Sequence, residues 1–193
     1  KTYFDQVSFD LIYARQDQTL EAWKEELSEA IDMSAGHLSL YQLTIEPGTA
    51  FGFRAQAGKL AGLPNEDLSA DMFDVTNEIC AKAGLYAYEV SSYSHKTLES
   101  KHNNIYWRGG DYVGIGPGAH GRLTLGGKRH ATRTALAPQA WLERVKLQKS
   151  GTSHQETLTP RDHANKLIMM GLRILDGISQ TRIESVAHAP LEI

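Results

Sequence analysis

Short apolar runs and helix-spaced apolar stripes alternate along roughly the first ninety residues of the chain. Residues 6–13, 37–43 and 85–90 are mostly apolar runs of strand length, and the first should be a mostly buried strand with one charge, Asp10. Residues 20–31 and 68–83 carry apolar side chains every three or four positions, as amphipathic helices do. This alternation predicts parallel βαβ units, in a barrel or in an open doubly wound sheet.

Capping residues indicate where these two helices begin and end. Thr19 is placed to cap the first helix and Gly36 follows its end, while Gly84 is the expected C′ residue of the second helix. Residues 46–49 break the second strand, and a loop is expected from there to Pro64.

The pattern changes in the second half of the chain. Residues 91–133 are rich in glycine, aromatics and histidine and predict a loop that encloses a short strand near residues 112–115. Helices are predicted over residues 138–149 and 160–175, the second capped by Thr159 and ended by Gly177. This shift from α/β to all-α predicts two domains, residues 1–137 and residues 138–193.

Charge and cysteine content exclude several classes of protein. With 20 basic and 23 acidic residues among 193, the net charge is −3, which argues against nucleic-acid binding through bulk positive charge. The single cysteine, Cys80, excludes an internal disulfide and a cysteine-rich metal centre within this chain, so a reducing compartment is expected. No apolar run is long enough to span a membrane and no signal-peptide core is present, which predicts a cytoplasmic protein. Both ends suggest a fragment of a longer chain.

Asp10 is the first candidate for chemistry. A carboxylate in an apolar strand is costly unless it is paired or faces a ligand at the carboxyl end of the strand, where it could accept hydrogen bonds from a ribose or an amine. A buried structural aspartate is an equally good interpretation of the residue. Both stay open.

The run from His102 to Gly110 holds the densest set of candidate ligand residues. His102 could ligate iron, Tyr106 and Trp107 could flank a planar ligand, and Lys101 and Arg108 could pair with carboxylates, as a haem site requires. The residues alone favour the alternative, in which the aromatic side chains fill the core and two glycines form a turn.

Two further sets carry weaker signals. Residues 114–121 are glycine-rich but match neither the P-loop nor the dinucleotide fingerprint, so they form either a ligand-facing loop or a tight turn. The histidines within residues 91–133 do not have the spacing of a zinc site.

Several ordered motifs together resemble one family. They are residues 9–13 with 18–19, residues 37–49, and above all residues 102–112 running into residues 114–120. These runs resemble the radical SAM proteins of the oxygen-independent coproporphyrinogen III oxidase superfamily, and the His-Asn-x-x-Tyr-Trp run is more typical of its haem-chaperone branch, HemW, than of the oxidases.

The resemblance implies the last strand–helix units of a radical SAM (β/α) barrel followed by a mostly helical C-terminal domain. It implies that S-adenosyl-L-methionine (SAM) contacts Asp10, Thr44 and His120. It also implies a haem site, with the candidate residues His102, Tyr106, Trp107 and Arg108. The [4Fe–4S] cluster would be held by cysteines upstream of this chain, which itself contributes no cluster ligand and no assigned catalytic residue.

The chain departs from the family pattern directly after the first strand. The family commonly reads Gly-Leu-Pro-Gly-Gln-Thr there, whereas this chain has Ala14, Arg15, Gln16 and Asp17 before Gln18 and Thr19. The lost glycines and proline predict an altered loop beside Asp10.

We therefore expect a fragment of a HemW-like haem chaperone that binds haem and SAM in its full-length form and passes haem to an accepting protein. One alternative is a coproporphyrinogen III oxidase, which would oxidatively decarboxylate coproporphyrinogen III to protoporphyrinogen IX. Another is a structural fragment without catalysis. A homodimer also stays open.

Overall fold

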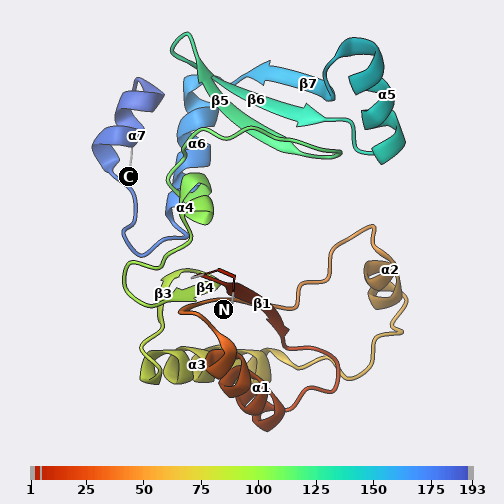
Figure 1. Ribbon diagram of the computed structural model, residues 1–193, viewed down its shortest axis with the longest axis vertical. Helices are drawn as coiled ribbons and strands as arrows, with labels where there is room; N and C mark the ends of the chain where they lie inside the picture. Colours follow the sequence, from red (N-terminus) through yellow and green to blue (C-terminus); the bar gives the residue numbers. More distant parts are fainter. Residues whose placement is uncertain (1–2, 5, 191–193) are drawn as a thin grey trace. The chain divides into compact units, whose positions relative to one another are not determined.

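The computed structural model describes residues 3–4 and 6–190, which form two compact units (Figure 1). The N-terminal unit covers Lys1–Ser100 and the C-terminal unit covers Lys101–Ile193. Each mixes helices with strands, so the chain is α/β as expected. No helix within the described part of the chain is long and apolar enough to cross a membrane.

The N-terminal unit contains the predicted βαβ unit. Strand β1 (Ser8–Tyr13) pairs in parallel with β2 (His37–Gln42), and α1 (Leu20–Met33) connects them. The third predicted strand, β3 (Tyr86–Glu89), has the same direction as β2 but does not pair with it. Strand β4 (Ser92–Ser94) lies between the two and is antiparallel to both, in the order β1-β2-β4-β3. Strand β4 falls in a segment predicted as loop.

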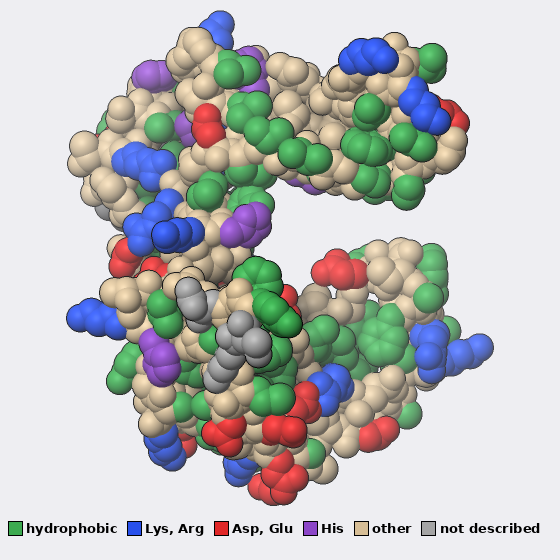
Figure 2. Space-filling model, viewed as in Figure 1, with side chains coloured by type: hydrophobic (Ala, Val, Ile, Leu, Met, Phe, Trp, Pro, Cys, Tyr) green, Lys and Arg blue, Asp and Glu red, His purple; other side chains and the backbone are tan. Residues whose placement is uncertain are grey.

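Helices α1 and α3 (Glu66–Lys82) pack against each other on one face of this sheet (Figure 1). Their buried side chains meet Leu38 and Leu40 of β2 in the core, where Trp23 Nε1 donates a hydrogen bond of 2.8 Å to Thr76 Oγ1. The outer face of α1 is acidic, and Figure 2 shows acidic side chains gathered over this part of the unit.

The predicted caps of these helices are confirmed. Ala22 N donates to Thr19 Oγ1 at the start of α1, and Gly84 follows α3 with a φ of +76°. The segment expected to be a loop up to Pro64 instead contains α2 (Ala50–Gln56), which Thr49 caps.

The expectation that the first strand is mostly buried is wrong. Of the residues in β1 only Tyr13 is buried, whereas Phe9 is 37% and Ile12 45% exposed. The reason is its position at the edge of the sheet, where β2 is its only partner strand among the described residues.

The C-terminal unit is built on an antiparallel sheet in the order β5-β6-β7 (Figure 1). Its elements are α4 (Lys101–Trp107), β5 (His120–Leu125), β6 (Lys128–Thr134), α5 (Pro138–Gln148), β7 (Thr152–Thr157), α6 (Pro160–Gly171) and α7 (Gln180–Ala187). Thr159 caps α6 as predicted, through a hydrogen bond from Asp162 N. Helix α6 ends earlier than expected, and Gly177 lies in the turn beyond it.

Several predictions for this half differ from the structure. Residues 91–133 hold β4, α4, β5 and β6, while the strand predicted near residues 112–115 is reduced to one bridge between Tyr112 and Arg122. Strand β7 lies in a segment predicted as all-α and pairs with β6. This pairing joins the chain on both sides of Pro138, and the boundary between the two compact units lies after Ser100.

Candidate functional site

Four polar residues form a row across the sheet of the N-terminal unit. In the sheet, Asp10 lies opposite Ser39, Ser39 opposite Ser92, and Ser92 opposite Glu89, so the row crosses all four strands. The neighbouring residues Leu38, Leu40 and Tyr93 belong to the core beneath the helices. Since side chains alternate along a strand, the polar row lies on the opposite face.

His37 lies at the next position along this face and hydrogen-bonds to two hydroxyl groups. Its Nδ1 lies 2.7 Å from Ser8 Oγ and its Nε2 lies 2.9 Å from Tyr88 Oη, so hydrogen bonds hold both ring nitrogens. Burial lowers the pKa of His37, while the negative charges of Asp10 and Glu89 act in the opposite direction. The dominant effect of burial favours a neutral imidazole that links two hydroxyl groups.

The row offers hydrogen-bonding atoms that the described residues do not use. Glu89 Oε2 and Ser92 Oγ are buried and have no hydrogen-bond partner within residues 3–4 and 6–190. Asp10 is exposed at the edge strand, which contradicts the interpretation of it as a buried structural aspartate. The exposed carboxylate of Asp10 can accept hydrogen bonds from a ribose or an amine.

Glu89 was missed at the sequence level, although the same signal that singled out Asp10 was present. It is the only charge in the apolar run of residues 85–90. The bulge in β3 between Ala87 and Glu89 and the insertion of β4 place it in the row, and neither feature could be seen in the sequence.

The other two residues expected to contact SAM lie elsewhere. Thr44 is exposed, two residues beyond β2, and its Oγ1 donates a long hydrogen bond of 3.4 Å to Gln42 O. His120 is the exposed first residue of β5 in the C-terminal unit. Asp10 and Thr44 thus belong to the N-terminal unit, and His120 belongs to the C-terminal unit.

The loop after β1 keeps a backbone conformation suited to glycine despite its altered sequence. Ala14 and Asp17 have φ values of +58° and +57°, and these are the two positions at which the family pattern has glycine. Asp17 N donates to Gly62 O at 2.7 Å, and Arg15 forms a 2.6 Å ion pair with Glu26. The substituted residues thus adopt left-handed conformations, and contacts with neighbouring segments hold the loop.

The residues expected to bind haem divide between two sides of α4. His102 and Tyr106 are one turn apart, with ring centroids separated by 4.8 Å and rings nearly perpendicular. Tyr106 makes a similar edge contact with Tyr112, at 4.5 Å. We call His102, Tyr106 and Tyr112 the aromatic row. His102 is its exposed end.

Trp107 and Arg108 point instead toward the segment that follows α6. The guanidinium of Arg173 lies 4.5 Å from the ring centre of Trp107, and Arg108 donates to Asp176 at 2.5 Å. Both residues therefore contact the segment after α6. The structure therefore brings together His102 and Tyr106, but not all four candidates.

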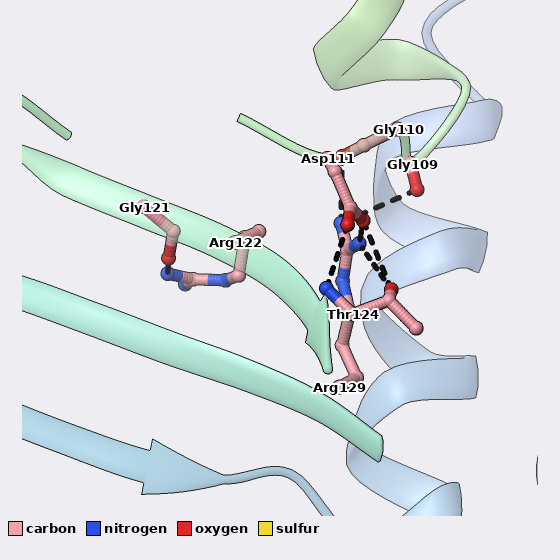
Figure 3. A network of polar contacts seen from close by, with 7 residues as sticks. All are labelled: Gly109, Gly110, Asp111, Gly121, Arg122, Thr124 and Arg129. Atoms are coloured by element: carbon pink, nitrogen blue, oxygen red, sulfur yellow. Dashed lines mark hydrogen bonds and ion pairs between the residues drawn. The ribbon is translucent and has the colours of Figure 1, made fainter. Parts of the chain in front are cut away.

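A capped turn and a buried arginine hold the end of α4. Gly109, at a φ of +64°, and Gly110 donate to the carbonyls of Tyr106 and Ile105, which is a Schellman cap. Figure 3 shows Arg129 extending from β6 to this turn, where it donates to the carbonyls of both glycines and to Asp111.

Asp111 is held as a carboxylate within the same network. Its pKa is lowered, first by the hydrogen bond from Thr124 N and also by the Thr124 hydroxyl and the charge of Arg129, against the smaller opposing effect of burial. The network fixes the turn after α4 against β5 and β6.

The glycine-rich segment after this turn packs against β6. Thr134 Oγ1 accepts a hydrogen bond from Ala119 N and donates to Gly116 O, and Gly118 N donates to Ala135 O. These contacts support the interpretation of residues 114–121 as a tight turn.

Comparisons with known proteins agree with the resemblance seen in the motifs. No protein-family model matches the chain. It is 35% identical over 182 residues to the mitochondrial radical S-adenosyl methionine domain-containing protein 1 of Danio rerio, covering 92% of this chain and 41% of that protein. It is 34% identical over 185 residues to the heme chaperone HemW of Escherichia coli, covering 95% of this chain and 46% of that one.

A solved structure supports the fold. The coproporphyrinogen III oxidase HemN of Escherichia coli, described as a radical SAM enzyme, matches with a TM-score of 0.71 at 16% identity, over 94% of this chain and 43% of that one. The chain thus spans less than half the length of these relatives. From the motifs, the relatives and the fold together, the chain belongs to the radical SAM superfamily of HemW and the coproporphyrinogen III oxidases and corresponds to the C-terminal part of that fold.

Proposed function

We propose that this chain is part of a HemW-like radical SAM haem chaperone, in which it contributes residues toward SAM and presents haem-binding residues on α4. The observation that carries the proposal is the similarity to HemW proteins over more than nine-tenths of the chain. The aromatic row supports it, because it places an exposed histidine beside a tyrosine ring that a porphyrin could contact.

The polar row of the N-terminal unit suits the SAM part of the proposal. Asp10 is exposed and can accept hydrogen bonds from ribose hydroxyls or an amine, while the unused oxygens of Glu89 and Ser92 lie in the same row but are buried. Thr44 and His120 are proposed SAM contacts on the family pattern alone.

The proposal does not assign Cys80 as a ligand of the [4Fe–4S] cluster. Cys80 is fully buried between α3 and the sheet, and burial raises the pKa of its thiol to about 12. Such a thiol does not fit a cluster ligand, because iron binds the thiolate. On the family pattern the [4Fe–4S] ligands belong to the upstream part of the protein.

For haem, we propose that His102 is the iron ligand and Tyr106 contacts the porphyrin. Trp107 and Arg108 would then act by holding α4 against the segment after α6. An accepting protein for the haem and a homodimer stay predictions.

Haemin titration followed by the Soret band tests the haem proposal. Wild-type chain should bind in a saturable manner with a shifted Soret maximum, and His102→Ala should lose that shift. His154→Ala, which removes an exposed histidine of β7 in the same unit, is the matched control and should bind as wild type does. Equal binding by the His102 variant would place any haem site elsewhere.

The fold similarity to HemN favours the oxidase as the second candidate. It predicts that the reconstituted full-length parent protein converts coproporphyrinogen III to protoporphyrinogen IX. Absence of that product, with the cluster and SAM present, would leave the chaperone. Binding of haem or SAM would in turn contradict a purely structural fragment.

A further inference from the structure

A small cavity in the C-terminal unit borders the aromatic row. It has a volume of about 60 Å³, and Tyr106 and Tyr112 are among the residues that line it. Arg122, Arg129 and Lys166 also line it. A cavity of this size holds a few water molecules, which is room for a carboxylate group but not for a ring system.

The cations around this cavity outnumber the anions that neutralise them. Arg129 is committed to Asp111 and to backbone carbonyls, as Figure 3 shows. In the same view Arg122 folds back to donate to Gly121 O, in its own strand. Within the described residues neither Arg122 nor Lys166 has an ion-pair partner.

His163 lines the same cavity and reports on its electrostatics. Its pKa is lowered first by burial and then by the positive charges of Arg129 and Arg182, against the opposing charge of Asp111. The contributions of Arg129 and Arg182 indicate a positive potential at this position, and that potential would favour an anion placed beside Arg122 and Lys166.

We propose that Arg122 and Lys166 form an anion subsite that binds a carboxylate arm of the tetrapyrrole whose ring lies against the aromatic row. This inference rests on the proposed haem function and deepens it. It also replaces the expectation that Arg108 pairs with such a carboxylate, because Arg108 already forms an ion pair with Asp176. The aromatic row links the subsite to His102 through two ring contacts.

Comparing haem with its dimethyl ester, in which both propionates are neutral, tests the subsite. Wild-type chain should bind haem about tenfold more tightly than the ester, a preference typical of charge-assisted hydrogen bonds. Arg122→Gln and Lys166→Gln should weaken haem binding toward that of the ester and leave ester binding unchanged. Arg133→Gln, which removes an exposed cation of β6, is the matched control and should keep the full preference.

The outcomes separate this inference from the proposed function. If wild type binds haem and ester equally, or if both Gln variants keep the preference, the subsite is refuted while the haem site stands. If wild type binds neither ligand, the proposed function fails for this chain.

A second measurement probes the subsite without haem. Sodium propionate at millimolar concentration should shift the side-chain NMR signals of Arg122, Lys166 and His163 in wild type. The double variant Arg122→Gln/Lys166→Gln should leave the His163 signal unmoved. Absence of a shift in wild type would overturn the subsite, and circular dichroism of each variant checks that its fold is intact.

Discussion

Arg129 of β6 forms an ion pair with Asp111 on the turn that follows α4, and the same guanidinium donates to the carbonyls of Gly109 and Gly110. Only 7% of the Arg129 side chain is exposed, against 44% for Asp111. A single buried side chain thus connects the antiparallel sheet to the helix that carries His102 and Tyr106.

Arg129→Ala should lower the free energy of unfolding of the C-terminal unit by about 2–3 kcal/mol, because hydrogen bonds to charged groups contribute about 1.5–3 kcal/mol and their partners lose them together. Arg129→Lys should recover only part of the lost stability, since an ammonium lacks the planar set of donors. Native-state hydrogen exchange of the β5 and β6 amides measures the free energy of unfolding.

Arg133→Ala, at an exposed position of β6, is the control and should change the free energy of unfolding by less than about 0.5 kcal/mol. An equal effect of both alanine variants would contradict the role of Arg129.

Asp111 should make the C-terminal unit sensitive to acid. Its pKa is lowered in the folded state, so its stabilising contribution is complete above its ordinary pKa of 3.8 and is lost as the pH falls through the lower folded value. In the Asp111→Asn variant, the free energy of unfolding should depend less on pH in this acid range. Urea unfolding between about pH 5 and pH 2 measures it, and an unchanged acid slope in the variant would rule out this residue as the cause.

Ala14→Gly should stabilise the N-terminal unit. At a φ of +58° an L-residue costs about 1–2 kcal/mol, and the greater freedom of glycine in the unfolded chain offsets about 0.5–1 kcal/mol of the gain. Ala70→Gly is the matched control, because Ala70 is an exposed residue inside α3 where glycine should destabilise by about 1 kcal/mol. Thermal unfolding should show opposite signs for the two variants. Destabilisation by both would show that the Ala14 methyl group matters more than its backbone strain.

Cys80 should be inert in the folded protein. Its thiol is fully buried, and its pKa of about 12 leaves almost no thiolate near neutral pH. Alkylation by iodoacetamide at about pH 8 should therefore proceed only at the rate at which the N-terminal unit opens. Ser28→Cys, at an exposed position of α1, should react at once under the same conditions. Rapid native labelling of Cys80 would mean that the core beneath α3 is open to solvent.

Local signals explain what could be predicted of the helices. Thr19, Gly84 and Thr159 act on backbone groups within a few residues of themselves, so their capping roles can be predicted from the sequence alone. Strands β4 and β7 could not be found in this way. They are short or largely polar, and pairing with distant strands stabilises them.

The same distinction applies to the candidate site. The family motifs and the positions of Asp10 and His102 can be read from the sequence alone, because they are properties of residue order. The folded chain was needed to show that Glu89 joins the row of Asp10, that Trp107 and Arg108 turn away from Tyr106, and that Arg129 holds the turn after α4. These relationships depend on strand register and on contacts between residues far apart in the chain, which the periodicity of a single segment does not encode.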